Sequence, residues 1–154
     1  MKKIILYTLL TFSTSFYSQD FDRGVLEENN RIKLLEELSQ LSGIKIDKMN
    51  VLVVNFYTKP KTEPNGSCID YYTNDYGYLK FIKKNKNIVQ FFITERSYVY
   101  SRKNVLKDKN DEIKKMLFEN AKSCGNYIII KPTGEFIRKF GEYRQDEIPK
   151  LIKQ

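Results

Sequence analysis

The sequence predicts an α/β fold of three layers, with helices on both faces of a central sheet. Three short runs rich in β-branched and aromatic residues indicate buried strands at 49–57, 87–94 and 126–131. Helical segments separate these runs, and a turn at 132–134 joins the last run to an alternating partner strand. The resulting order is β-α-β-α-β-β-α. Because helices between strands usually connect parallel neighbours, this order predicts parallel pairing of the buried strands and one antiparallel hairpin at the edge.

The N-terminal part of this fold begins with an amphipathic helix at 26–42, whose leucines recur at steps of three and four before Gly43. We expect residues 19–43 to form an N-terminal helical extension and residues 44–154 to form the main domain. After the strand at 49–57, two prolines and an Asn-Gly pair predict a loop at 58–67. The next segment, 68–84, has the apolar spacing of a single helix.

From residue 95 on, the apolar spacing is less regular, and the expected elements are shorter. The polar stretch 95–110 has one segment suited to a short strand, at 98–100. Asn110 or Asp111 is placed to cap a helix that continues to Ala121. A short helix at 145–153 closes the chain, and Pro149 places its first turn near that residue.

Two further groups of residues have a structural and a functional interpretation. The acidic run 108–112 copies the first positions of a calcium-binding loop, but Ile113 replaces the glycine that such a loop needs, so helix capping is favoured. The tyrosines of the helix at 68–84 have the spacing of core or half-buried residues and could alternatively line a pocket. They are Tyr71, Tyr72, Tyr76 and Tyr78.

Composition excludes several classes of function. The chain has 154 residues, enough for one domain with its own core. It has no histidine, the commonest general base and metal ligand, and its two cysteines are too few for a four-cysteine zinc site. No glycine-rich nucleotide-binding loop or nucleophile-elbow motif is present. The sequence therefore predicts neither a metal nor another cofactor, and it specifies no reaction.

Residues 1–18 have the pattern of an export signal. Lys2 and Lys3 precede an apolar stretch, Ile4–Phe12, and small serines follow it up to Ser18. The nine apolar residues are fewer than the roughly 20 of a membrane-spanning helix, which favours cleavage after Ser18 over an uncleaved anchor. The segment resembles signal peptides of Bacteroidetes-type bacteria. We therefore expect a periplasmic or secreted protein that has no membrane span after cleavage.

The net charge of the chain bears on the partners that it could bind. The net charge of the whole chain is +8 and falls to +6 once the two signal lysines are removed. The densest basic cluster is Lys80–Lys86, but carboxylates are interspersed through most of the sequence. We interpret the excess mainly as solvated surface and expect no nucleic-acid partner, whereas binding to anionic envelope polymers remains open.

Two segments carry a resemblance to a known family. The strand at 51–57 resembles the one that leads into the active-site loop of thioredoxin-like proteins, and 127–141 with 146–152 resembles their closing hairpin and helix. The resemblance covers about residues 44–153 and is closest to exported thiol-disulfide oxidoreductases and peroxiredoxin relatives. It implies a thioredoxin-like three-layer sandwich with an added N-terminal helix.

The sequence departs from that family where the family has its reactive groups. No cysteine lies at 57–64, where the family has C-x-x-C, and Asn65–Cys68 has only the second cysteine of such a motif. The family's cis-proline before the third strand is also missing, because Cys124 and Gly125 precede that strand. The resemblance therefore implies a degenerate active site.

The same resemblance implies that Cys68 and Cys124 are neighbours. A structural disulfide, two unpaired buried thiols and a redox-active pair all remain open. We expect a binding or accessory module of the cell envelope that acts with a protein partner. The alternative is a divergent thiol oxidoreductase that uses Cys68, with Cys124 as resolving partner.

Overall fold

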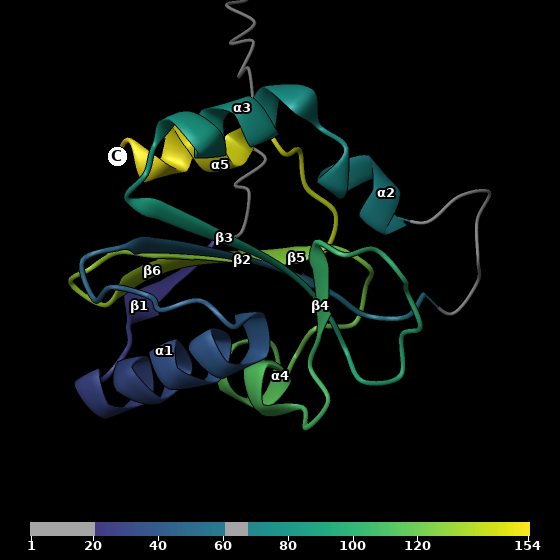
Figure 1. Cartoon of the computed structure of the whole chain (residues 1–154), viewed down its shortest axis with the longest axis horizontal. Coiled ribbons are helices and arrows are strands. Elements are labelled where there is room, and N and C mark those ends of the chain that lie inside the picture. The colour runs from purple at the N-terminus through teal and green to yellow at the C-terminus, as the bar shows by residue number, and fades with distance from the viewer. Residues whose placement is uncertain (1–20, 61–67) are drawn as a thin grey trace, which may run out of the picture.

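A computed structural model describes residues 21–60 and 68–154, in which six strands form one mixed sheet (Figure 1). The export signal expected at 1–18 lies outside the described residues. The order of the strands across the sheet is β1-β6-β5-β2-β3-β4. Their bounds are β1 Asp22–Val25, β2 Val51–Tyr57, β3 Ile88–Thr94, β4 Val105–Lys107, β5 Asn126–Ile130 and β6 Glu135–Phe140.

Two elements of the predicted pairing are confirmed and one is wrong. β2 and β3 are parallel, and β5 and β6 form the expected antiparallel hairpin. β5, however, runs antiparallel to β2. Asn126, the first residue of β5, pairs with Phe56 near the end of β2, so the chain enters the sheet where β2 leaves it. The helical segment before β5 therefore does not make β5 parallel to β2, as the sequence predicted.

The sheet also has two more strands than the four in the predicted order. β1 pairs antiparallel with β6 at one edge, and β4 pairs parallel with β3 at the other. The prediction of a strand at 98–100 is wrong, because the strand of the segment 95–110 is Val105–Lys107. Both edge strands are too short for their alternation to be distinguished from loop sequence.

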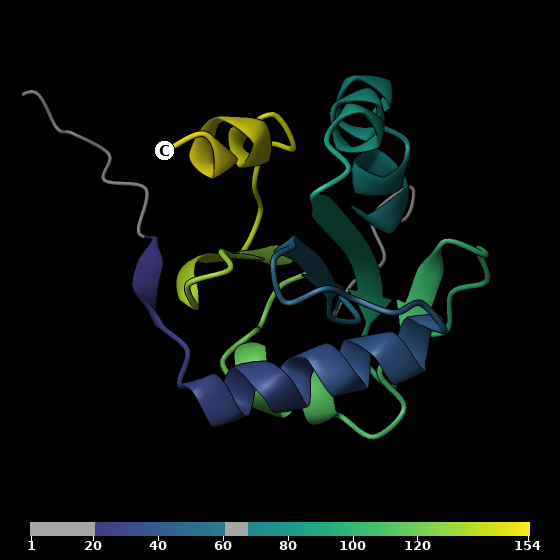
Figure 2. The same cartoon turned by 60° about the vertical axis from the view of Figure 1, so that its left-hand side comes forward.

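Helices cover both faces of the sheet, which confirms an α/β architecture of three layers (Figures 1 and 2). The helices are α1 Glu28–Ser42, α2 Cys68–Thr73, α3 Tyr76–Lys84, α4 Glu112–Leu117 and α5 Glu147–Ile152. α1 and α4 pack on one face, and α2, α3 and α5 pack on the other. β2 alternates between the two resulting cores, because Val54 and Phe56 contact the first and Val53 and Tyr57 the second.

The N-terminal segment contributes to the same core as the rest of the chain. Leu34 and Leu38 lie one helical turn apart and are almost completely buried against the sheet. α1 then ends as predicted at Gly43, whose φ of 71° is left-handed and whose N–H donates to Ser39 O. Residues 22–42 thus supply both an edge strand and a covering helix.

The segment predicted as one helix at 68–84 is two helices. Asn74 and Asp75 separate α2 from α3, and the Asp75 carboxylate accepts a hydrogen bond from Tyr78 N at 2.9 Å. An aspartate that caps a new helix competes with continuation of the preceding one. This local competition overrides the apolar periodicity that joins the two segments.

α4 is capped from the acidic run 108–112, as predicted, but by Asp108 rather than by Asp111. The Asp108 carboxylate accepts from Glu112 N at 3.1 Å and from Lys114 N at 2.8 Å, whereas Asp111 makes no side-chain cap. α4 also ends at Leu117 rather than Ala121. Pro149 lies in the first turn of α5, where no intrahelical N–H bond is needed.

Candidate functional site

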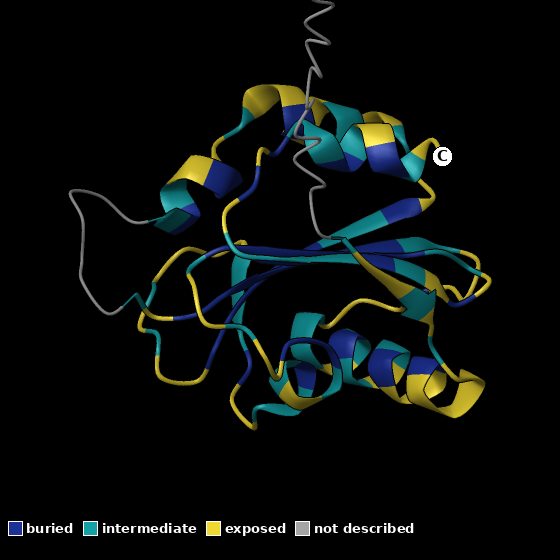
Figure 3. Ribbon diagram, turned by 180° about the vertical axis from the view of Figure 1, so that it is seen from behind, coloured by how far each residue is buried: buried dark blue, intermediate teal, exposed yellow. Residues whose placement is uncertain are grey.

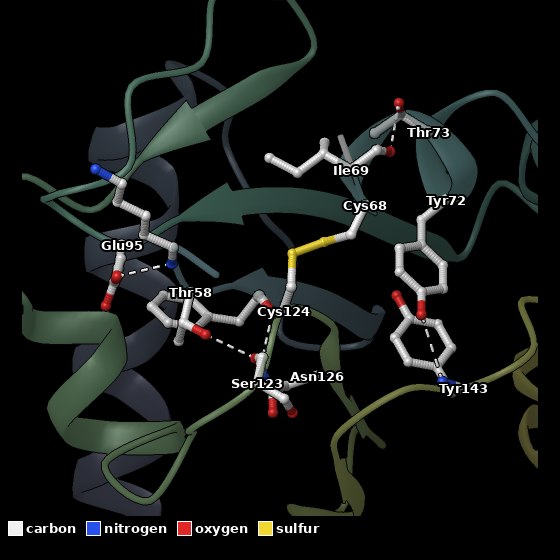
Figure 4. Close-up of a disulfide and its surroundings, with 12 residues drawn as sticks. Thr58, Cys68, Ile69, Tyr72, Thr73, Glu95, Ser123, Cys124, Asn126 and Tyr143 are labelled. Atoms are coloured by element: carbon white, nitrogen blue, oxygen red, sulfur yellow. Dashed lines mark hydrogen bonds between the residues drawn. A yellow bond between two sulfur atoms is a disulfide. The ribbon is translucent and has the colours of Figure 1, made fainter. Parts of the chain in front are cut away.

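Cys68 and Cys124 form a disulfide between the first residue of α2 and the loop before β5 (Figure 4). Their Cα atoms lie 6.4 Å apart although 56 residues separate them in sequence. Both residues are half-buried, and both pack against the core beneath α2, α3 and α5. The predicted contact and the disulfide are therefore confirmed, and the chain has no free cysteine.

Hydrogen bonds hold the Cys124 loop against the end of β2. Thr58 Oγ1 donates to Ser123 O at 2.7 Å, and Asn126 Nδ2 donates to the same oxygen at 3.0 Å and to Phe56 O at 3.1 Å. The other side of the Asn126 amide accepts from Gly141 N at 3.1 Å. One buried amide thus joins the end of β2, the Cys124 loop and the residue after β6.

Gly125 allows this loop to pass close to α2. Its φ is 113°, in the region that side chains other than glycine rarely adopt. A Cβ atom at this position would lie 3.0 Å from the hydroxyl oxygen of Tyr72. A larger residue at this position would therefore be strained.

Stacked tyrosines lie beside the disulfide. Tyr72 of α2 packs between Tyr57 and Tyr143, with ring centroids at 5.8 and 4.2 Å, and Tyr127 meets Tyr143 edge-on at 4.7 Å. Burial raises the pKa values of Tyr57 and Tyr143 well above 10, so both hydroxyls stay protonated. These rings are core that supports the disulfide.

The four tyrosines singled out from the sequence therefore divide into two pairs. Tyr72 and Tyr78 are buried, which confirms the core interpretation for them. Tyr71 and Tyr76 are 66% and 77% exposed. The pocket beside β1 and β6, the one between α1 and α4, and the one beside α5 are lined by other residues.

A largely buried polar network, which the sequence reasoning missed, connects β2 and β3 on the face of the sheet covered by α2, α3 and α5. Gln90 Nε2 donates to Asn55 Oδ1 at 2.7 Å, and the Asn55 amide donates to the hydroxyl of Tyr143. The hydroxyl of Tyr78 completes the network by donating to Gln90 Oε1. The signal was present in the sequence, because Asn55 and Gln90 each interrupt an otherwise apolar strand.

Glu95, also missed, lies just after β3 at the same end of the sheet (Figure 4). Its carboxylate accepts from Lys59 N and Lys114 Nζ, both at 2.8 Å, and from Ser97 Oγ at 2.9 Å. Burial by itself would raise the pKa of Glu95, but these hydrogen bonds outweigh burial and lower the pKa. The ionised carboxylate therefore fixes the start of the loop that follows β2.

Residues 61–67, which include most of the degenerate motif Asn65–Cys68, lie outside the described residues. Within 21–60 and 68–154, no three carboxylate or cysteine side chains come together as metal ligands would. The helices of the same residues are all too short or too polar to cross a bilayer. The site is thus a clamped disulfide with buried tyrosines beneath it.

No protein-family model matches the sequence, and no curated protein matches it either.

Proposed function

We propose that this chain is an exported thioredoxin-like protein that has lost dithiol chemistry and serves as a binding or accessory module of the cell envelope. The observation that carries the proposal is the disulfide between Cys68 and Cys124. It joins the two loops in which the resembled family has its dithiol and its proline. With no third cysteine in the chain, these loops hold a crosslink in place of a C-x-x-C pair.

The arrangement of the sheet supports the thioredoxin-like part of the proposal. A parallel pair, β2 and β3, lies beside the antiparallel hairpin of β5 and β6, and helices cover both faces. β1 and β4 are additions at the two edges of this arrangement.

The contacts of the disulfide support a structural role. Thr58 and Asn126 both donate to Ser123 O and so hold the loop that carries Cys124 against the end of β2, independently of the sulfur–sulfur bond. Closing a loop of 56 residues stabilises a fold by about 4 kcal/mol in the chain-entropy model. An oxidising compartment, as the expected export signal implies, would preserve such a bond.

One observation favours the alternative of a divergent thiol oxidoreductase. Both cysteines are half-buried rather than fully enclosed, and Cys68 is the first residue of α2. In that alternative, an external dithiol first reduces the Cys68–Cys124 bond. The thiolate of Cys68 then attacks a substrate disulfide and forms a mixed disulfide, releasing one substrate thiolate; Cys124 attacks the sulfur of Cys68, releasing the second substrate thiolate and restoring the Cys68–Cys124 bond.

Reduction of insulin by dithiothreitol distinguishes the two functions. We expect the protein and its Cys68→Ser variant to leave the rate of insulin precipitation equal to that of dithiothreitol alone. A faster rate with the unmodified protein than with the variant would overturn the accessory function. Intact-mass measurement after alkylation, natively and after reduction, provides the second readout. We expect neither cysteine to be alkylated in the folded protein, with or without reductant, until the protein is denatured.

A further inference from the structure

The outer side of α3 carries only positive charge. Three lysines of the helix lie on its exposed side, and Lys86 follows just after its end. From residue 76 to residue 94 the chain has four lysines and no aspartate or glutamate. By contrast α1, on the opposite face of the sheet, has glutamates as well as Arg31 and Lys33. The three helical lysines are Lys80, Lys83 and Lys84.

These lysines are not neutralised by neighbours. Among the residues that the structure describes, none of the four takes part in an ion pair. Three carboxylates of the same helical layer have other partners. Asp70 pairs with Arg102, Glu147 with Lys139, and Asp75 caps its own helix. An anionic partner would therefore meet an unopposed positive field at α3.

Apolar side chains lie among the lysines on the same side of the helix. Tyr76 is 77% exposed and Leu79 is 37% exposed, and Lys80 Nζ lies 6.0 Å from the centre of the Tyr76 ring. At 100° per residue, positions 76, 79, 80, 83 and 84 share one stripe, opposite the buried Tyr78. Exposed residues cover the outer side of this helical layer (Figure 3). We call the stripe formed by positions 76, 79, 80, 83 and 84 the lysine face.

We propose that the lysine face binds the surface of an anionic phospholipid bilayer. Lysines attract lipid phosphates, and each basic residue near such a surface strengthens binding about fivefold. The exposure of Tyr76 and Leu79 favours a bilayer over a soluble polyanion as the partner. A tyrosine ring and an aliphatic side chain enter the headgroup region of a bilayer, whereas a polyanion offers them nothing to contact. This inference does not rest on the proposed loss of dithiol chemistry.

Co-sedimentation with vesicles tests the proposal on the protein as purified from cells. Vesicles of phosphatidylglycerol mixed with phosphatidylcholine are compared with vesicles of phosphatidylcholine alone, at low salt. We expect binding to the anionic vesicles that weakens as salt is added. Replacing Lys80, Lys83 and Lys84 by glutamine should weaken this binding roughly a hundredfold. No preference for the anionic vesicles would overturn the proposal.

A control variant has the same change in net charge on the other face of the sheet. It replaces Lys33, Lys109 and Lys115, which lie on or next to α1 and α4, by glutamine. We expect this variant to bind anionic vesicles nearly as tightly as the unmodified protein. Equal weakening of both triple variants would show that net charge alone drives binding and would overturn the proposal. Residues 1–20 are identical in every sample, so their contribution cancels.

A second variant separates lipid from polyanion. Tyr76→Ser combined with Leu79→Ser keeps every lysine. We expect it to bind anionic vesicles more weakly than the unmodified protein while its retention on heparin stays the same. Unchanged vesicle binding would show that the lysines alone account for it, as they would for any polyanion, and would overturn the bilayer as the preferred partner.

Discussion

The hydroxyl of Thr58 donates a hydrogen bond to the carbonyl oxygen of Ser123, 65 residues further along the chain. The neighbouring disulfide between Cys68 and Cys124 connects the same two regions of the fold. The loop before β5 is therefore held by a covalent bond and by hydrogen bonds that do not depend on it. Loss of the disulfide should lower stability without changing the fold.

We expect the double variant Cys68→Ser/Cys124→Ser to unfold with a free energy about 3–4 kcal/mol lower than that of the oxidised protein. The reason is that the unfolded chain regains the freedom of a closed loop of 56 residues. Urea denaturation measures the difference, and dithiothreitol should bring the unmodified protein to the level of the variant. Equal stability of the oxidised and reduced protein would contradict this prediction.

The substitution Asn55→Ala should lower the free energy of unfolding by about 1–3 kcal/mol. It leaves Gln90 and the hydroxyl of Tyr143 without their shared partner in a buried site. Asn104→Ala, at an exposed position in the loop before β4, is the control and should be nearly neutral. Similar stabilities of the two variants would mean that the network contributes little.

Gly125→Ala should destabilise the protein by about 1–3 kcal/mol, because alanine at a φ of 113° is strained and its Cβ meets Tyr72. Gly77→Ala is the matched control. Gly77 lies within α3 and has room for a Cβ atom, so alanine there should be neutral or stabilising by up to about 1 kcal/mol. Thermal unfolding of both variants checks the opposite signs.

The buried tyrosines predict a loss of stability at alkaline pH. Burial raises the pKa values of Tyr57, Tyr78 and Tyr143 above 10 in the folded protein, whereas they titrate near 10 once unfolded. Their contribution is therefore complete below about pH 10 and is lost as the pH rises further.

Absorbance of tyrosinate measures this titration directly. We expect the buried Tyr57, Tyr78 and Tyr143 to ionise only as the protein unfolds. In denaturant, every tyrosine should titrate near pH 10. Ionisation of every tyrosine near that pH with the fold intact would refute the prediction.

The sequence predicted the parts of this fold that depend on strong local patterns. The strands β2, β3 and β5 are mostly apolar runs, and Gly43 ends α1 as its position suggested. The pairing of β5 was wrong because strand direction depends on where the chain re-enters the sheet, which no local pattern records. The break between α2 and α3 depends on one capping residue, Asp75, whose effect periodicity does not show.

The candidate site was predicted in one part and missed in another. The contact between Cys68 and Cys124 followed from the resemblance, because that resemblance placed two distant loops side by side. Glu95 and Asn126 gave no such signal. Both are polar residues at strand ends, where polar residues are common, and only their partners in the fold give them a role.

The two outermost strands of the sheet, β1 and β4, have four and three residues, whereas β2 and β3 in the interior have seven each. Each of these two strands therefore presents only a few unpaired N–H and C=O groups on its outer side. A second chain that paired with either strand could form only a short ladder of hydrogen bonds, too few to offset the entropy of association. Their lengths thus make β1 and β4 poor templates for polymerisation by strand addition.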